Sequence, residues 1–481
     1  MASPSPRAQK FDRSIVEGPL ASAVWRLAWP TMLQNVIAGL QGIIDHAMVG
    51  HFVGFTGNAA IGVSLQIFLV VIVFIASLFT GMGVLVARFA GAGDAEKVNR
   101  VVYQAFLTAF GLASVILAPA GYFLSPYLLD VVHASPAVKE AALPFLRTMF
   151  VGSIGMMLFF MLGGALRAAG DARTPLRLGI AATVLNVIFN VVLIPGLGPI
   201  PRLGAFGAAI GTVSANLLVS AYAIALVLAG RCVVRLPRNM SFKPDWTIIK
   251  SLFRFGLPTG LQGIAMNVAG VLMLRFMGSL EHSAEAQAAY AVGYTELFSL
   301  ITWTSVGLMG AASAVSGQNL GAGRPDRAAA GAWVAARIGL GVAAVVGSMF
   351  VLIPEYLLAI FGMNDKVVLD IASQLLRYLA ISGFFIAVAL TYTGALQGTG
   401  DTKSPFYITL VSQIAIPLGM CTVLDSMGTL RPSDIWLAIV LGHMTRCLLS
   451  VLRFRQGKWR DIRVDIDPAR DVRTLPTSGR S

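Results

Sequence analysis

Long apolar segments separated by short polar connectors run along the whole chain. About 20 apolar residues, rising about 1.5 Å each in a helix, cross the roughly 30 Å hydrocarbon core of a bilayer. The pattern therefore predicts an all-α polytopic membrane protein. Twelve segments are predicted to be transmembrane helices, at residues 27–49, 59–87, 101–123, 144–164, 175–195, 204–229, 251–278, 286–314, 330–354, 371–396, 405–424 and 434–454.

The second half of the chain repeats the first. Residues 164–175 (GALRAAGDARTP) and 394–405 (GALQGTGDTKSP) share six of twelve positions at an offset of 230. Residues 30–34 (PTMLQ) and 258–262 (PTGLQ) match at an offset of 228. Because each half has an even number of spans, both halves enter the membrane in the same direction. This predicts two pseudo-symmetric six-helix lobes.

The repeat also divides the chain into units. The N-lobe is predicted at residues 23–230 and the C-lobe at 251–455, joined by a cytoplasmic linker at 231–250 that contains two prolines. The polar segments 1–22 and 456–481 are predicted to be cytoplasmic tails, the second of them disordered. No cleavable signal precedes the first span, so this span is expected to stay in the protein.

Composition and charge exclude several classes of protein. With 56% hydrophobic and 12% charged residues, the chain differs from soluble domains, in which about 25% of residues are charged. The formal net charge of +13 is concentrated in alternate connectors, such as 91–100, 166–177 and 452–460. This distribution follows the positive-inside rule and is not a nucleic-acid-binding stripe. It predicts that both termini are cytoplasmic and that nucleic acid is not a partner.

Signatures of catalysis are missing from the sequence. Cys232, Cys421 and Cys447 are far apart and form no zinc-binding or disulfide pattern. The glycine-containing loops lack the P-loop pattern, and no Ser/His/Asp or Cys/His grouping stands out. The protein is therefore predicted not to be an enzyme and to need no cofactor.

One predicted span carries a carboxylate. Asp45 lies in the later half of span 27–49, and an acid near the centre of a membrane helix costs roughly 2.5 to 3.5 kcal/mol. Such a group normally faces a bundle interior or a wet cavity, so we expect an ion or proton site. The alternative is that Asp45 lies near the outer end of a tilted helix, solvated or paired. Pro30, earlier in the same span, gives the helix a bending point.

Three polar side chains on later spans are candidate partners of Asp45. Asn186 and Asn190 are four residues apart and so share one helix face, where their amide oxygens can ligate a cation. Thr212 adds a hydroxyl from the next span. The alternative role for the two asparagines is interhelical hydrogen bonding, and the Thr212 hydroxyl can instead bond the carbonyl one turn back.

The second half contains its own charged candidates. Glu296 and Arg275 both lie in apolar surroundings within predicted spans. One interpretation is a structural ion pair, and the other is that Glu296 attracts a cationic substrate. Together with Met273, whose flexible thioether suits an adaptable apolar cavity, they are candidates for a substrate cavity in the C-lobe.

These features resemble the multidrug and toxic compound extrusion (MATE) family. The resemblance rests on PTMLQ at residues 30–34, DHAMVG at 45–50, the GAG loops and the repeated GALxxxGDxxxP, and it extends over about residues 26–453. It implies a twelve-helix antiporter that exports cationic and amphiphilic compounds in exchange for Na⁺ or H⁺. A bacterial inner-membrane location and a monomeric state are expected.

The resemblance also implies roles for single residues. Asp45 is similar by position to the family's cation-site carboxylate and Pro30 to the proline at which the first helix bends. Asn186, Asn190 and Thr212 fall where the family places the other groups of that site, with Asp45 and Asn190 as Na⁺ ligands if the protein is sodium-coupled. Some members carry a second acid where this chain has Asn190, and this difference leaves the coupling ion open.

Two hypotheses follow for the function. In the first, binding of H⁺ or Na⁺ at Asp45 shifts the equilibrium between lobe arrangements, the first helix bends at Pro30, and the N-lobe cavity contracts and displaces its cargo. In the alternative, the protein is a flippase for a lipid-linked or amphiphilic metabolite. Such a flippase is expected to line its central cavity with several basic residues, whereas only Arg275 is expected deep in a span.

Overall fold

The computed structural model describes residues 11–236, 243–363 and 365–466, and every one of the twelve predicted spans falls on a long helical rod. The six rods of the N-lobe are α2 (Leu20–Phe52), α3 (Phe55–Ala92), the continuous α4 (Ala95–Gly111), η1 (Leu112–Leu117) and α5 (Ala118–Val131), then α6 (Pro136–Ala168), α7 (Arg173–Leu193) and α8 (Ala205–Leu228). The fold prediction is confirmed, and most of the helices extend several residues beyond the predicted spans at one end or both.

The C-lobe repeats this order. Its rods are α9 (Trp246–Gly278), the continuous α10 (Ser283–Tyr290), η2 (Ala291–Leu297) and α11 (Ser299–Gly321), then α12 (Pro325–Leu352), α14 (Lys366–Thr399), the continuous α15 (Lys403–Thr409), η3 (Leu410–Ala415) and α16 (Ile416–Ser426), and α17 (Pro432–Arg455). Short helices add α1 (Ser14–Glu17), α13 (Pro354–Ala359) and η4 (Lys458–Asp461). The segments η1, η2 and η3 are π-helical turns within longer helices.

One rod is more polar than the others. Within the described residues, eleven helices are both long enough and apolar enough to cross a membrane, and α2 is not among them although it has 33 residues. The reason is visible in its sequence, because Gln34, Asn35, Gln41 and Asp45 interrupt the apolar run. A helix with such a polar load is stable in a membrane only where these side chains face protein or water.

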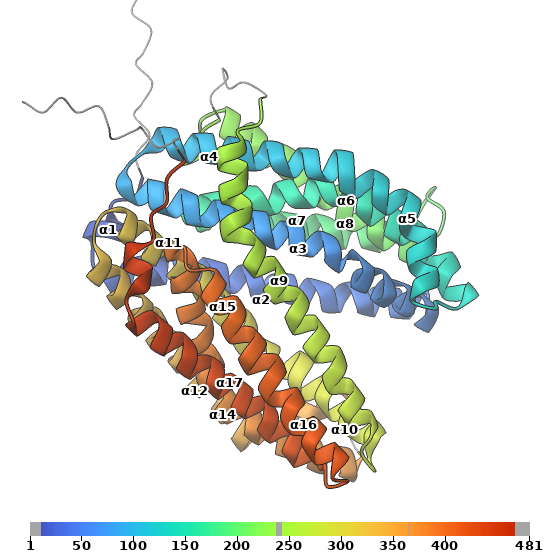
Figure 1. Cartoon of the computed structure of the whole chain (residues 1–481). Coiled ribbons are helices and arrows are strands. Elements are labelled where there is room, and N and C mark those ends of the chain that lie inside the picture. Colours follow the sequence, from blue (N-terminus) through green and yellow to red (C-terminus); the bar gives the residue numbers. More distant parts are fainter. Residues whose placement is uncertain (1–10, 237–242, 364, 467–481) are drawn as a thin grey trace, which may run out of the picture.

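The two lobes form a V (Figure 1). The N-lobe helices α2 to α8 make one arm and the C-lobe helices α9 to α17 the other, and the arms meet near α1 and diverge toward α5 and α16. Three clusters of buried apolar residues fill the molecule, one chiefly in the N-lobe, one in the C-lobe and one where the arms meet.

Close backbone approach holds the closed end of the V together. A Cβ added to Gly91 in α3 would lie 1.9 Å from the carbonyl oxygen of Gln318 in α11, and one added to Gly321 would lie 2.0 Å from that of Arg88. Gly91 and Gly321 are related by the 230-residue offset, and so are Arg88 and Gln318. The crossing is therefore pseudo-symmetric, and only glycine fits on either side of it.

Both ends of the described chain pack over this crossing. Ile15 is fully buried, and Asn319 and Arg324 donate to the carbonyl oxygens of Ile15 and Val16 at 3.3 and 2.8 Å. At the other end, Ile466 is fully buried in the N-lobe core. The prediction of disorder after Arg455 is therefore wrong for residues 456–466, which pack because they alternate polar groups with Trp459, Ile462, Val464 and Ile466. Residues 467–481 lie outside the described residues.

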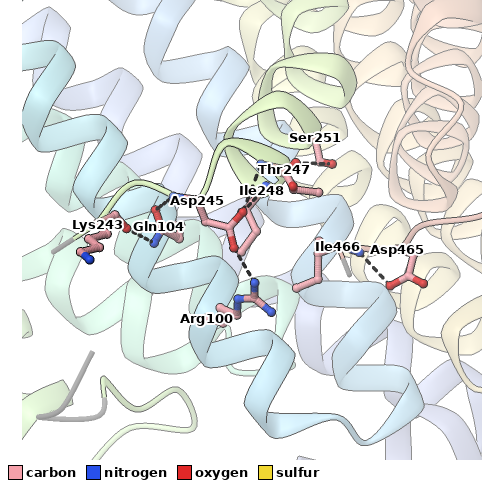
Figure 2. A network of polar contacts seen from close by, with 9 residues as sticks. All are labelled: Arg100, Gln104, Lys243, Asp245, Thr247, Ile248, Ser251, Asp465 and Ile466. Carbon is pink, nitrogen blue, oxygen red and sulfur yellow. Dashed lines mark hydrogen bonds and ion pairs between the residues drawn. The ribbon is translucent and has the colours of Figure 1, made fainter. Parts of the chain in front are cut away.

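A polar network fixes the junction between the lobes (Figure 2). Arg100 of α4 forms an ion pair with Asp245, with 2.5 Å between Nη2 and Oδ2. The other carboxylate oxygen of Asp245 caps α9 by accepting from the amides of Thr247 and Ile248. Gln104 donates to the carbonyl of Lys243 at 3.0 Å. The predicted linker 231–250 thus ends in helix from Trp246 onward, and its residues 237–242 lie outside the described residues.

Candidate functional site

The polar residues of α2 lie along one face of the helix. Gln34, Gln41 and Asp45 are spaced by seven and four residues, which places them one above the other over three turns. Because the polar face cannot be satisfied in lipid, it turns toward α7 and α8 of the same lobe, where hydrogen-bonding groups are available. This local pattern positions the carboxylate inside the N-lobe.

The structure brings Asp45 together with the two predicted asparagines. Nδ2 of Asn190 donates to Oδ1 of Asp45 at 2.7 Å and lies 3.3 Å from Oδ1 of Asn186. Nδ2 of Asn186 donates in turn to the Thr212 hydroxyl at 3.0 Å. The four residues that the sequence singled out therefore form one continuous chain of hydrogen bonds across α2, α7 and α8.

One oxygen in this chain is unsatisfied. Oδ1 of Asn190 is buried and has no hydrogen-bond partner among the described residues, and the Asn190 side chain is fully buried. It faces Gly211 of α8, where an added Cβ would lie 2.2 Å from this oxygen. A buried amide oxygen without a donor costs free energy, so it favours binding of a group that supplies positive charge.

A cavity opens beside this site, toward the closed end of the V. Its volume is about 240 Å³, and its walls include Gln34, Gln41, Thr183 and Arg167. The Thr183 hydroxyl donates to Gln41 at 2.7 Å, Gln41 bonds Asp45, and Nη1 of Arg167 donates to Gln34 at 2.7 Å. The carboxylate thus lies at the end of a hydrogen-bonded wall of a cavity large enough for part of an organic molecule.

The residues of this wall were not identified from the sequence. Gln34 and Gln41 could have been found from their spacing with Asp45 on one helix face, and Thr183 from its position seven residues before Asn190. Arg167 lies at the end of α6, in a stretch that reads as a basic cytoplasmic connector. Its burial depends on the helix continuing to Ala168, which composition does not reveal.

Pro30 is buried inside α2, and the helix continues through it without interruption. The pseudo-equivalent Pro258 lies within α9 in the same way. The backbone is therefore helical on both sides of the hinge predicted at Pro30.

The C-lobe candidates Arg275 and Glu296 do not form the predicted ion pair. Arg275 lies in the last turn of α9 and is exposed, Glu296 is half-buried in η2, and no ion pair between them occurs in the part of the chain that the structure describes. Met273 is buried and lines a C-lobe cavity of about 170 Å³, whereas Glu296 is absent from the described residues that form its walls.

The expectation that only Arg275 lies deep is also wrong. Arg446 is buried in the C-lobe, with 2% of its surface exposed, and Arg167 is half-buried in the wall of the N-lobe cavity. Arg275 is not deep in a span because α9 ends three residues later, at Gly278, and this places Arg275 in the last turn of the helix.

The N-lobe site offers oxygen ligands of the kind that hard cations prefer. Asp45 supplies a carboxylate, Asn190 and Asn186 supply amide oxygens, and Thr212 supplies a hydroxyl. The same carboxylate can take up a proton instead. In either case one positive charge neutralises the acid within the helix bundle.

Comparisons with known proteins agree with this architecture. The MatE family model matches residues 30–192 and 258–421, one match in each half of the chain. The probable multidrug resistance protein NorM of Thermotoga maritima is 28% identical over 440 residues, which cover 90% of this chain and 92% of that protein. The multidrug resistance protein MdtK of Edwardsiella ictaluri is 25% identical over 449 residues, covering 90% and 95%.

A solved structure shares the fold over almost the entire length of this chain. It is described as the outward-facing conformation of a multidrug resistance MATE family transporter of the MOP superfamily, and it superposes with a TM-score of 0.85 at 20% sequence identity. The alignment covers 96% of this chain and all of the solved chain. The twelve-helix, two-lobe arrangement of this chain is thus the fold of that solved structure.

Proposed function

The chain belongs to the MATE family of efflux transporters, and we propose that it is a secondary antiporter that exports organic cations and amphiphiles in exchange for H⁺ or Na⁺. The proposal rests on one observation. Asp45 is held inside the N-lobe by Asn190 at 2.7 Å, at the end of a cavity of about 240 Å³.

The first step is binding of the coupling ion. An ion arriving at Asp45 neutralises the carboxylate and competes with the hydrogen bond from Asn190. The unsatisfied amide oxygen of Asn190 then provides a ligand for Na⁺, after rotation of the amide, or an acceptor for the protonated carboxyl. Both events release the polar wall formed by Gln41 and Thr183 from its present arrangement.

The second step is contraction of the cavity. Asp45 and Pro30 lie on the same helix, 15 residues or about four turns apart, so bending at Pro30 moves the helix segment that carries Asp45 against α7 and α8. An organic cation bound in the N-lobe cavity loses both its space and its counter-charge. Coupling then follows because the ion and the cargo compete for one carboxylate.

The orientation of the molecule follows the charge of its loops. The basic connectors lie at the closed end of the V, and the positive-inside rule supports the proposal that this end faces the cytoplasm. The arms then open to the outside of a bacterial inner membrane, as expected for a protein that releases its cargo outward. The functional unit is a monomer, since each chain contains both lobes.

The flippase alternative lacks a specific supporting observation. Between the lobes lies a cavity of about 220 Å³, and Arg167 is the one basic residue among the described residues that line it. A path for an anionic lipid headgroup is expected to carry several cations along its length.

Dye efflux from everted membrane vesicles tests the proposal. An ethidium-like cation is followed under a Na⁺ gradient alone and then under a pH gradient alone, which identifies the coupling ion. Asp45→Asn should abolish gradient-driven efflux while the protein still inserts at wild-type levels. The matched control is Asp130→Asn, which changes an exposed acid that pairs with Lys139. Undiminished efflux by the Asp45 variant would remove this residue from the mechanism.

A further inference from the structure

The C-lobe contains a cavity that the proposed N-lobe mechanism does not use. Its volume is about 170 Å³, and its walls include Met266, Met273, Tyr290, Tyr294 and His443. It is lined by α9, α16, α17 and the region where α10 continues into the π-helical turn η2. Gln413 reaches it from a second π-helical turn, η3. Such turns displace side chains from the regular helical register and are frequent at functional sites.

This cavity is the pseudo-symmetric counterpart of the N-lobe cavity. The offset of 228 residues that relates Pro30 to Pro258 also relates Asp45 to Met273, because α2 and α9 are each continuous between these positions. The same offset relates Gln41 to Ala269, and both of these residues line the cavity of their own lobe. Where the N-lobe presents a carboxylate, the C-lobe therefore presents a thioether.

A buried cation lies beside this cavity. Arg446 of α17 is 2% exposed, and the one hydrogen bond recorded for its guanidinium within the described residues joins Nη1 to the Met266 sulfur, 3.7 Å away. Its Nε is buried without a partner, and no described carboxylate pairs with it. Met266 lines the cavity, so the guanidinium lies directly behind the cavity wall.

An unpaired arginine in this setting favours an anion. A buried charge is normally paired, because removal from water is costly and only an opposite charge with good hydrogen bonds offsets the cost. A guanidinium is planar and matches a carboxylate with two parallel hydrogen bonds. Met266, a weak acceptor, satisfies little of this capacity, so a carboxylate entering the cavity gains what the protein does not provide.

The shape of the cavity favours a flat ring attached to that carboxylate. Tyr290 and Tyr294 are stacked with centroids 4.8 Å apart and an interplanar angle of 7°. His443 is nearly parallel to Tyr294, with ring centroids 6.4 Å apart and an interplanar angle of 16°, and its Nδ1 lies 2.5 Å from the Ser382 hydroxyl. Parallel aromatic faces beside two methionines accept planar apolar groups.

We propose that the C-lobe cavity binds small aromatic carboxylates, with Arg446 as the counter-charge. The ligand ring lies against the tyrosine faces, and its carboxylate faces the guanidinium. The inference rests on the proposed function in one respect, namely that a compound bound inside a lobe is cargo for export. It extends that function from cations, held by the N-lobe acid, to anions held by the opposite lobe.

Equilibrium binding to the purified full chain in lipid nanodiscs, without any ion gradient, tests the inference. Benzoate is the probe and benzamide is its neutral control of nearly the same shape. The wild-type protein should bind benzoate at least about tenfold more tightly than benzamide. Arg446→Gln should remove that preference and leave benzamide binding unchanged. Equal binding of the two compounds by the wild type, or a preference that survives in the variant, would overturn the inference.

A second pair of variants decides the matter if Arg446→Gln does not fold. Met273→Asp places an acid where Asp45 lies in the other lobe, and it should abolish the preference for benzoate because it competes for the guanidinium. Met273→Leu keeps the wall apolar and should retain the preference. An unchanged preference in Met273→Asp contradicts the inference.

The outcomes for the two lobes are separable. Asp45→Asn should keep wild-type benzoate binding, because its site is in the N-lobe, while it loses dye efflux. If the wild type exports dye but binds benzoate no better than benzamide, the C-lobe site alone is rejected. Intact efflux by Asp45→Asn with normal benzoate binding would reject the N-lobe mechanism alone.

Discussion

The two lobes share a scaffold but not a chemistry. In the N-lobe, a carboxylate is hydrogen-bonded to an asparagine at 2.7 Å beside a polar cavity wall. In the C-lobe, the position of Asp45 is taken by Met273, and the buried charge is the arginine Arg446 on the last helix. The charges beside the two cavities therefore differ: the N-lobe has the Asp45 carboxylate and Arg167, whereas the C-lobe has Arg446 and no acid among the described residues that line its cavity.

The backbone differs at the same places. Helices α3 and α7 of the N-lobe are α-helical throughout, whereas their C-lobe counterparts contain η2 and η3. These π-helical turns lie next to the C-lobe cavity and carry Tyr294 and Gln413 into its wall. Divergence after duplication has thus changed the cavities, while the crossing of Gly91 and Gly321 kept its symmetry. The scaffold is conserved between the halves because it controls how the lobes pack, and the cavities are free to specialise.

The largest effect expected from breaking this comparison concerns Asn190. Asn190→Leu removes the donor to Asp45 and the adjacent unsatisfied oxygen. Hydrogen bonds to charged groups contribute about 1.5–3 kcal/mol, so coupled dye efflux should fall by about tenfold or more. The C-lobe counterpart by the 230-residue offset is Met420, and Met420→Leu should leave efflux unchanged. Equal losses in both variants would show that the polarity of α7 is not specific to the N-lobe site.

A smaller difference is expected between the two helix prolines. Pro30→Ala restores a backbone donor and removes the bending point of α2, so efflux should fall several-fold while thermal stability is maintained or increased. Pro258→Ala makes the same change in α9, which carries no acid, and should reduce cation efflux less. Parallel efflux and melting measurements on both variants check this. If the two variants lose efflux equally, bending is a property of both lobes and is not tied to Asp45.

The sequence predicted the scaffold and half of the chemistry. Twelve spans and the duplication follow from hydropathy and from direct matches such as residues 164–175 with 394–405, because lipid imposes a strict length and composition on each helix. The cluster of Asp45, Asn186, Asn190 and Thr212 was also expected as a group, since acids and amides are rare in spans and must find one another.

The C-lobe cavity could not be predicted in the same way. Arg446 lies within the predicted span 434–454, nine residues before the end of α17, and was not singled out from the sequence. Its burial depends on which face of α17 turns inward, and this is set by packing against α9 and α14 rather than by sequence period. An ion pair between Glu296 and Arg275 was predicted because both are charged and have apolar neighbours in the sequence. In the structure they are apart: Glu296 is half-buried in η2, and Arg275 is exposed at the end of α9.

The glycine crossing provides a test in which the lobes should behave alike. Gly91→Ala and Gly321→Ala each place a methyl group within about 2 Å of a carbonyl oxygen of the other lobe, and such overpacking costs about 1–3 kcal/mol. Both variants should therefore lower the melting temperature by a similar few degrees. Gly341→Ala in α12, where an added Cβ meets no atom within 4 Å, serves as the control. A large shift for only one of the pair would contradict a symmetric crossing.

The smallest effect concerns the segment that joins the lobes. Burial, with a contribution from the negative charge of Asp171, raises the pKa of the Cys232 thiol, so less thiolate is present near pH 7.5 than for a free cysteine. In a Cys421→Ser/Cys447→Ser background, maleimide should label Cys232 in everted vesicles about two- to threefold more slowly than an exposed thiol, and the rate should rise as the pH approaches 9. Asp171→Asn should speed labelling slightly.

Because the segment lies on the side of the basic loops, intact spheroplasts should show no labelling by a membrane-impermeant reagent. Labelling from the outside of the spheroplasts would show that both lobes have the opposite orientation in the membrane. Each cavity would then release its cargo in the opposite direction.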